Sequence, residues 1–272
     1  MANRFAVLGS PIAHSRSPLL HRAAISALGV DAEYSAVEVT EADFSFFLAS
    51  QDADSLGFSL TMPLKHVVRP FLTSECEVST LTGSVNTIIR GDGGWHGFNT
   101  DVWGAQTAIA QSLGTQFQSA TVLGSGATAS SIVAALHALG VAELTVVARD
   151  TAKAASTAEF ATRLGMSARG IEWGTDSVQS DILVNTLPGS VTIDAEIIED
   201  LDAAALFDVV YDPWPTSLAR EWAARGLPSS NGLLMLLWQA VRQARIFYGE
   251  SIDEELPNEQ RVITAMRSAV GL

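Results

Sequence analysis

Cysteine is nearly absent from this chain of 272 residues, since Cys76 is the only one. A single cysteine cannot form a disulfide within the chain, and it has no second thiolate with which to build a zinc or iron–sulfur site. The histidines His14, His21 and His66 also lack carboxylate or cysteine companions at the spacing of metal ligands. We therefore expect no metal ion, and a reducing compartment, the cytoplasm.

Runs of positive charge and long apolar runs are absent too. The formal net charge is −14 and the 16 lysines and arginines form no run, so the chain would repel a nucleic-acid backbone. The apolar stretch at residues 232–241 is interrupted by Gln239 and has about half the ~20 residues of a membrane span. The N-terminal apolar stretch is too short for a signal peptide. We expect no nucleic acid and no membrane as partners, and a monomer or a homodimer.

What the chain does contain is an alternation of β-rich apolar runs with helical patterns, which is typical of parallel α/β structure. The first part predicts strands at residues 4–9, 34–39 and 57–61, and helices at residues 18–29, 42–50 and 63–72. In residues 85–98 the turn signal GDGG lies between VNTIIR and WHGF and predicts a β-hairpin. We expect this hairpin to close a mixed, mostly parallel first sheet.

A second βα series follows the first. It predicts strands at residues 121–124, 143–148, 181–186 and 205–211. Two amphipathic helices near residues 239–249 and 257–270 are expected to return to the first domain. The predicted fold class is therefore α/β with two domains: an N-terminal domain of residues 1–103 plus 240–272, and a Rossmann-type domain of residues 104–239.

A glycine-rich turn opens the second series. Gly124, Ser125, Gly126, Ala127 and Thr128 follow a predicted strand and precede a helix, and with Ala129 they complete the pattern G-x-G-x-x-A. The first glycine permits a tight turn, the second lets a pyrophosphate approach the backbone, and the helix N-terminus attracts the phosphates. A plain strand–turn–helix is the simpler alternative, but the position between a strand and an Ala-rich helix favours a dinucleotide site.

The residues at the end of the next predicted strand determine whether NAD or NADP is the preferred nicotinamide dinucleotide. An acidic residue there would bind a ribose 2′-hydroxyl, whereas this chain has Ala148 followed by Arg149, Asp150, Thr151 and, two residues on, Lys153. Two cations at the start of a helix oppose its dipole, and a 2′-phosphate between them would remove that conflict. We therefore predict NADP rather than NAD. Alternatively, Arg149 is a surface residue and Asp150 only a helix cap.

Polar residues gather in short segments at the ends of apolar elements. These segments are residues 10–18 (SPIAHSRSP), 57–65 (GFSLTMPLK), 83–87 (GSVNT), 97–104 (GFNTDVWG) and 232–239 (GLLMLLWQ). Through them the chain resembles the shikimate dehydrogenase family over nearly its whole length. Ser59 departs from the pattern, because many members carry Asn at that position.

The resemblance implies reduction of 3-dehydroshikimate to shikimate by NADPH, a step of chorismate and aromatic amino acid biosynthesis. It implies that the N-terminal domain binds the substrate and the Rossmann domain binds NADP. The residues that it implies for the substrate carboxylate are Ser15, Ser17 and Tyr211, and those for the ring hydroxyls are Thr61, Asn86, Asp101 and Gln239, around Lys65. The cofactor contacts that it implies are Glu77, Val209 and Gly232.

Lys65 also makes chemical sense without the family. Hydride delivery to a carbonyl carbon creates an alkoxide, and a proton donor must stand within hydrogen-bond reach of that oxygen. Pro63 suits a first helical position, which would put Lys65 in a first turn, where the dipole disfavours its positive charge. A neighbouring Asp101 carboxylate would have the opposite effect. Which effect is larger stays open, and either permits Lys65 to act as a general acid and base.

Each of these residues has a simpler interpretation as well. Ser17 before Pro18 suits a helix N-cap, Asp101 could cap a helix that begins at Val102, and Gln239 could be a polar position on a helix face. Two rival functions remain: a quinate/shikimate dehydrogenase that prefers NAD, and a non-catalytic metabolite sensor of the same fold. Arg149 and Lys153 argue against the first rival, and retention of both Lys65 and Asp101 argues against the second.

Overall fold

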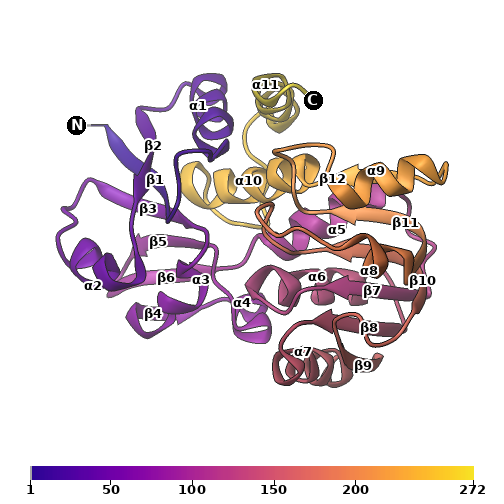
Figure 1. The fold of residues 1–272 in the computed structure, drawn as a ribbon. Coiled ribbons are helices and arrows are strands. Elements are labelled where there is room, and N and C mark those ends of the chain that lie inside the picture. Colours follow the sequence, from indigo (N-terminus) through magenta and orange to yellow (C-terminus); the bar gives the residue numbers. More distant parts are fainter. Residues whose placement is uncertain (1) are drawn as a thin grey trace. The chain divides into compact units, whose positions relative to one another are not determined.

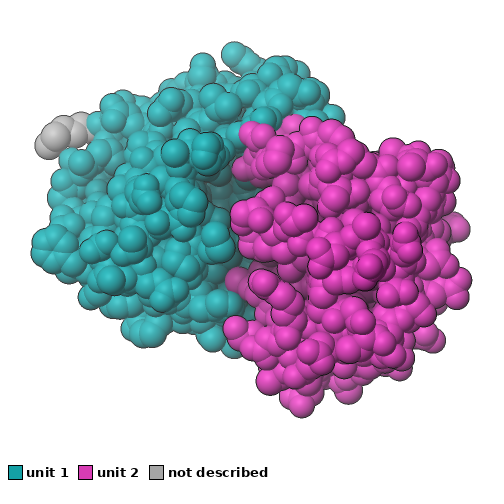
Figure 2. Space-filling model, viewed as in Figure 1, with its two compact units in different colours: residues 1–100, 236–272 teal, residues 101–235 magenta. Residues whose placement is uncertain are grey.

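The computed structural model describes residues 2–272, which divide into two compact units. Unit 1 consists of residues 1–100 and 236–272, and unit 2 of residues 101–235, as coloured in Figure 2. The division predicted from the sequence lay at 103/104 and 239/240. Each unit contains one sheet of six strands with helices around it, so the predicted α/β fold class is confirmed.

Unit 1 is built around a mixed sheet. Its strands are β1 (Asn3–Gly9), β2 (Ala32–Glu38), β3 (Ser55–Leu60), β4 (Leu72–Glu75), β5 (Thr87–Gly91) and β6 (Gly94–Phe98), in the order β2-β1-β3-β5-β6-β4. β1 pairs in parallel with β2 and β3, and β5 pairs antiparallel with β3 and β6. The predicted hairpin is therefore present. It does not close the sheet, however, because β4 pairs in parallel with β6 and takes the edge.

The helices of unit 1 are short except those at the two ends of the chain. They are α1 (Ser17–Leu28), α2 (Glu41–Ala49), α3 (Leu64–Val67), the 3₁₀ turn η1 (Arg69–Phe71), α4 (Glu77–Thr82) and α11 (Glu259–Val270). The helix predicted over residues 63–72 is broken into α3 and η1, since Pro70 cannot donate the hydrogen bond that would continue it. Two elements, β4 and α4, were not predicted.

Alternating side chains of β1 show how the sheet of unit 1 is covered on both faces. Ala6 and Leu8 pack with α2 and α3 through Phe44 and Leu64. Phe5 and Val7 point to the opposite face and pack in a second cluster that includes residues of α1 and α10 (Leu233–Tyr248). Figure 1 shows α1 and α11 side by side, so the predicted return of the last helices to the first part of the chain is confirmed for α11.

Unit 2 has a fully parallel sheet. Its strands are β7 (Ser119–Leu123), β8 (Glu143–Ala148), β9 (Ser167–Glu172), β10 (Val178–Asn185), β11 (Leu201–Asp208) and β12 (Ser229–Asn231). Its helices are α5 (Asp101–Ser112), α6 (Ala127–Ala138), α7 (Thr151–Arg163), α8 (Ala195–Glu199) and α9 (Ser217–Ala224), and α10 begins here and continues into unit 1.

The strand order β12-β11-β10-β7-β8-β9 is that of a Rossmann fold, in which the chain starts in the middle of the sheet and winds outward in both directions. The reversal lies between β7 and β10, where ligands of such sheets bind at the carboxyl ends of the strands. The helices α8 and α9 lie beside β10 and β11 (Figure 1). Their Ile198, Leu218 and fully buried Trp222 pack with residues of these strands and cover one face of the sheet.

A polar cluster interrupts the apolar core of unit 1. His21 on α1 is fully buried; its ring stacks on that of Tyr34 at a centroid distance of 4.1 Å. Its two nitrogens lie 3.2 Å from the Tyr248 hydroxyl and 3.1 Å from Oε1 of Gln243. Burial lowers the pKa of His21 to about 4, with the Gln243 bond opposing the shift. The folded protein therefore keeps this imidazole neutral at pH values where an exposed histidine is charged.

That burial predicts an acid-sensitive stability. Since the ordinary pKa of histidine is 6.5 and the folded value is about 4, the unfolded chain takes up the proton first as the pH falls. The unfolding free energy should be undiminished above pH 6.5 and fall by about 3 kcal/mol towards pH 4 on account of this group. Urea unfolding of the wild type and of His21→Gln at several pH values checks this. The same pH dependence in both proteins would contradict it, and His137→Gln, on an exposed position of α6, is the matched control.

Candidate active site

Lys65 lies on α3, which follows β3 after a short connection that begins at Thr61. Pro63 is the N-cap of this helix and not its first residue, so that part of the prediction is wrong. Lys65 is the second residue and stands in the first turn, as predicted. Three main-chain bonds hold this segment: Thr61 N–H donates to Leu8 O at 2.9 Å, Leu64 N–H to Thr61 O at 2.8 Å, and Val85 N–H to Lys65 O at 2.9 Å. The lysine backbone is thus anchored to the segment that leads into Asn86.

Asn86 and Thr100 join two further predicted segments. The Asn86 side chain donates from Nδ2 to the Thr100 hydroxyl at 2.8 Å and accepts the Thr100 main-chain N–H at 2.9 Å. Both residues are almost completely buried. A nearby bond of 2.8 Å runs from Asn99 Nδ2 to the Thr82 hydroxyl. These side chains therefore hold the start of β5 to the end of β6 and to α4. Neither Asn86 nor Asn99 lies in the hairpin turn, which Asp92 and Gly93 form between the paired residues Gly91 and Gly94.

The remaining residues of unit 1 that were predicted to bind the substrate lie in a loop and on two helices. Ser15 and Ser17 flank the start of α1, and Ser17 N–H lies 3.3 Å from the Ser15 hydroxyl. Ser17 is the first helical residue and Arg16 takes the cap position, so the N-cap interpretation of Ser17 is wrong. Gln239 is buried on α10, and its Nε2 donates to Leu236 O at 2.7 Å.

Ser59, the departure from the family pattern, belongs to the core of unit 1. Its side chain is buried on β3, accepts a hydrogen bond of 2.7 Å from the Tyr34 hydroxyl and donates one of 2.9 Å to Gln243 Oε1. Sequence reasoning treated this position only as a weakened substrate contact. The structure gives its hydroxyl two internal partners instead.

Asp101 and Tyr211 lie in unit 2. Asp101 follows Thr100 in the chain and is the first residue of α5, so the helix does not begin at Val102. Tyr211 lies after β11, in the segment that leads to α9. The pairing of Asp101 with Lys65 remains a prediction.

The glycine turn has the geometry that its sequence predicts. Gly124 has φ +102°, and a Cβ there would lie 2.5 Å from the Thr186 hydroxyl after β10. Only glycine fits both the conformation and the space. At Gly126, the N-cap of α6, a Cβ would meet no atom within 4 Å. The turn is therefore closed at Gly124, against the residue that follows β10, and open at Gly126. Ala129, in the first turn of α6, is fully buried. This arrangement fits a pyrophosphate on the helix N-terminus.

The two predicted cations of the 2′-phosphate site lie after β8. Ala148 ends that strand, and Arg149 and Asp150 are exposed. Asp150 caps α7 by accepting the Lys153 N–H at 3.1 Å, and its other oxygen lies 3.8 Å from Lys153 Nζ. Asp150 is therefore the N-cap of α7, as its alternative interpretation from the sequence expected. Thr151 is the first residue of α7, which places Arg149 and Lys153 on either side of its N-terminus.

Val209 and Gly232, two predicted cofactor contacts, are in direct contact with each other. A Cβ on Gly232 would lie 2.0 Å from Val209 O, so no other residue fits without moving that backbone. The third, Glu77, is the first residue of α4 in unit 1.

Asp208 is a structural residue of this region that sequence reasoning missed. It is fully buried at the end of β11 and accepts hydrogen bonds from Asn185 Nδ2 at 3.0 Å, Val210 N–H at 3.0 Å and the Thr216 hydroxyl at 2.7 Å. Burial raises its pKa, and the three bonds oppose that shift. The carboxylate therefore anchors both ends of the segment that carries Val209 and Tyr211. An acidic residue ending an apolar strand was the only sequence signal.

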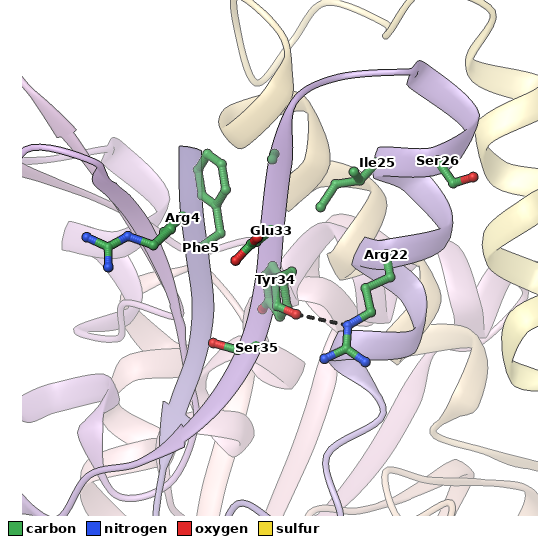
Figure 3. Close-up of a pocket in the computed structure, with 9 residues that line it drawn as sticks. Arg4, Phe5, Arg22, Ile25, Ser26, Glu33, Tyr34 and Ser35 are labelled. Carbon is green, nitrogen blue, oxygen red and sulfur yellow. Dashed lines mark hydrogen bonds between the residues drawn. The ribbon is translucent and has the colours of Figure 1, made fainter. Parts of the chain in front are cut away.

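A hollow on another side of unit 1 contains none of the predicted residues. Its volume is about 420 Å³, and Figure 3 shows it between α1 and the strands β1 and β2. Arg22 donates from Nε to Tyr34 O at 3.0 Å across it. This bond satisfies a carbonyl of β2, which is the edge strand of the sheet.

None of the helices in residues 2–272 combines the length and apolar character that a bilayer crossing requires. No group of three or more histidine, cysteine, aspartate or glutamate side chains in the same range is arranged to hold a metal ion.

A Rossmann-ordered sheet with an open glycine turn, in one chain with a second α/β unit, is typical of dinucleotide-dependent oxidoreductases. Comparison with known proteins narrows the class. Residues 7–88 match the family model of the shikimate dehydrogenase substrate binding domain. A shikimate dehydrogenase (NADP(+)) from Synechocystis sp. is 30% identical over 279 residues, which cover 97% of this chain and 93% of that protein.

Solved structures agree with these matches. Shikimate dehydrogenase from Mycobacterium tuberculosis is 37% identical, with a TM-score of 0.86 over 98% of this chain and 99% of that one. The enzyme from Thermus thermophilus, in complex with NADP(H) and shikimate, is 31% identical, with a TM-score of 0.80 over 99% of this chain and 100% of that one. The chain belongs to the shikimate dehydrogenase family.

The open side of Gly126 generates a prediction about cofactor binding. Gly126→Ala meets no protein atom and its φ of −90° suits any residue, so the unfolding free energy should stay within about 1 kcal/mol of the wild type. The added methyl group occupies the space needed by a pyrophosphate, so the Kd for NADP should rise roughly tenfold or more. Calorimetric titration with NADP and urea unfolding measure the two quantities. Unchanged NADP affinity would place the phosphates elsewhere.

Proposed function

We propose that this protein is a shikimate dehydrogenase that reduces 3-dehydroshikimate to shikimate with NADPH, reversibly, in the biosynthesis of chorismate and the aromatic amino acids. The observation that carries the proposal is the match over 99% of the chain to an enzyme solved with NADP(H) and shikimate, together with Lys65, Asn86 and Asp101 in the family's motifs. Unit 1 binds the substrate and unit 2 binds NADP. The single cysteine supports a cytoplasmic location.

The residues of unit 2 fit the cofactor. Main-chain N–H groups of Ser125, Ala127 and Thr128 would hold the pyrophosphate at the start of α6, since the first turn of a helix leaves such donors without partners inside the helix. Ala148, Arg149, Asp150, Thr151 and Lys153 would surround the adenosine ribose with its 2′-phosphate, and Val209 and Gly232 would line the nicotinamide end. When bound, NADPH supplies the hydride.

The residues of unit 1 bind the acid and move the proton. Ser15 and Ser17 hold the carboxylate with Tyr211 of unit 2, and Thr61, Asn86 and Gln239 bind ring hydroxyls. Lys65 donates its Nζ proton to the carbonyl oxygen during reduction and accepts one from the hydroxyl during oxidation. Asp101 orients the lysine ammonium. No step needs a group beyond these side chains and the cofactor.

The assay that tests the proposal follows NADPH absorbance after shikimate is added to enzyme and NADP. We expect NADP reduction with shikimate, and a higher kcat/KM with NADP than with NAD. Comparing shikimate with quinate under the same conditions tests the NAD-preferring rival. If neither acid is turned over with either dinucleotide, both dehydrogenase functions are excluded and the non-catalytic metabolite sensor is the remaining interpretation.

Replacement of the lysine tests its chemical role. Lys65→Ala removes the proton donor and should lower kcat by roughly 10²–10⁴-fold while KM changes little. Steady-state kinetics in both directions measure this. Arg163→Ala, which removes an exposed cation outside the proposed site, is the control and should leave kcat near its wild-type value. Turnover close to wild type in Lys65→Ala would remove that residue from the mechanism.

Replacement of the arginine after β8 tests the choice of cofactor. Arg149→Ala removes a cation that pairs with the 2′-phosphate, which NAD lacks, so KM for NADP should rise at least about tenfold and KM for NAD much less. Arg163→Ala, in the last turn of α7, is the control and should change neither KM for NADP nor KM for NAD. Equal effects of Arg149→Ala on both cofactors would reassign Arg149 to the general surface.

A further inference from the structure

Gln243 is a buried polar residue that the mechanism above does not use. It lies on α10, one helical turn after Gln239, and its side chain is 1% exposed. Its Oε1 accepts from the Ser59 hydroxyl at 2.9 Å and lies 3.1 Å from His21 Nε2. Its Nε2 donates to the Thr87 hydroxyl at 2.9 Å and to Asn86 O at 3.3 Å. One amide thus joins α1, β3, β5 and α10.

The orientation of this amide is determined by its partners. Asn86 O is a main-chain carbonyl and can only accept, so the Gln243 nitrogen must face it. Oε1 then faces His21, which must carry its hydrogen on Nε2. The neutral ring accepts at Nδ1 from the Tyr248 hydroxyl, 3.2 Å away. Each group in this half of the network therefore has one possible role.

The same reasoning determines the orientation of the Asn86 side-chain amide. Because the Thr87 hydroxyl already accepts from Gln243, its own hydrogen is directed to Asn86 Oδ1, 2.8 Å away. Thr100 N–H, which can only donate, reaches the same oxygen at 2.9 Å. Asn86 therefore keeps its carbonyl oxygen towards Thr87 and its Nδ2 towards the Thr100 hydroxyl. A rotated amide would exchange donor and acceptor at both places.

We propose that Gln243 is a positioning residue for substrate recognition, which acts through the Thr87 hydroxyl and, together with the Thr100 main-chain N–H, fixes the orientation of the Asn86 amide. The inference rests on the proposed role of Asn86 in binding a ring hydroxyl. Gln243 and Thr87 touch no substrate. They set which face of Asn86 donates and which accepts, and so which hydroxyl arrangement on a small ring acid is bound.

The experiment interrupts the chain at Thr87. Thr87→Val has nearly the same shape and removes the hydroxyl, whereas Thr87→Ser keeps it. We expect Thr87→Val to raise KM for shikimate roughly 3- to 10-fold, the worth of one buried hydrogen bond, with kcat and KM for NADP changed less than about twofold. Thr87→Ser should restore the wild-type KM. Gln243→Met, an apolar residue of similar length, should raise KM for shikimate in the same way.

A double-mutant comparison identifies the path. In an Asn86→Ala background, Thr87→Val should have no further effect on KM for shikimate, because the group it acts through is gone. An equal effect in both backgrounds, or no effect of Thr87→Val in the wild type, would overturn the inference while the proposed function stands. A wild-type KM for shikimate in the Asn86→Ala protein would overturn the inference as well.

A second readout does not depend on turnover. In ¹⁵N NMR spectra the side-chain amide of Asn86, assigned from the resonance lost in Asn86→Asp, should exchange its hydrogens faster with solvent in Gln243→Met and in Thr87→Val. Thr87→Ser should exchange as the wild type does. Unchanged hydrogen exchange in both variants would overturn the inference, whether or not the wild type oxidises shikimate. A wild type that does not oxidise shikimate would contradict only the proposed function.

Discussion

The amide of Gln243 lies where water does not reach, and the protein itself must satisfy its donors and its acceptor. An unmet buried amide group costs about 1–3 kcal/mol. Ser59, Thr87, His21 and the Asn86 carbonyl meet this demand from three separate elements. These bonds hold α1, β3, β5 and α10 in one arrangement in the core of unit 1. That arrangement places Asn86, with Thr100 and the anchored backbone of Lys65, at the ends of neighbouring strands.

Unit 2 solves the same problem with a carboxylate. Asp208 is fully buried at the end of β11, and hydrogen bonds from Asn185, Val210 and Thr216 meet both of its oxygens. The segment that carries Val209 is thereby held against Gly232. In both units a buried polar group is satisfied by segments that carry predicted site residues, so the hydrogen bonds that stabilise the core also hold those residues in place.

Much of this architecture follows from the sequence. Apolar runs predicted β1, β7, β8 and β10, and the glycine turn predicted its own closed and open sides. The edge strands β4, β9 and β12 could not be predicted, because exposed polar residues give no alternating pattern. Gln243 and His21 look like ordinary polar positions on helices, since only the fold brings them together. Arg149 and Lys153 were predicted as cofactor residues because charges at a helix N-terminus have a known chemistry, and their role remains a proposal.

The central claim is that the polar side chains of unit 1 bind the acid and the switch point of the parallel sheet binds the dinucleotide. A crystal structure with both NADP and shikimate tests it most directly. We expect the pyrophosphate on the main-chain N–H groups that follow Gly124, the 2′-phosphate beside Arg149, and a ring hydroxyl within hydrogen-bond distance of Lys65 Nζ. Shikimate bound away from Lys65 and Asn86, or phosphates away from the glycine turn, would contradict the account.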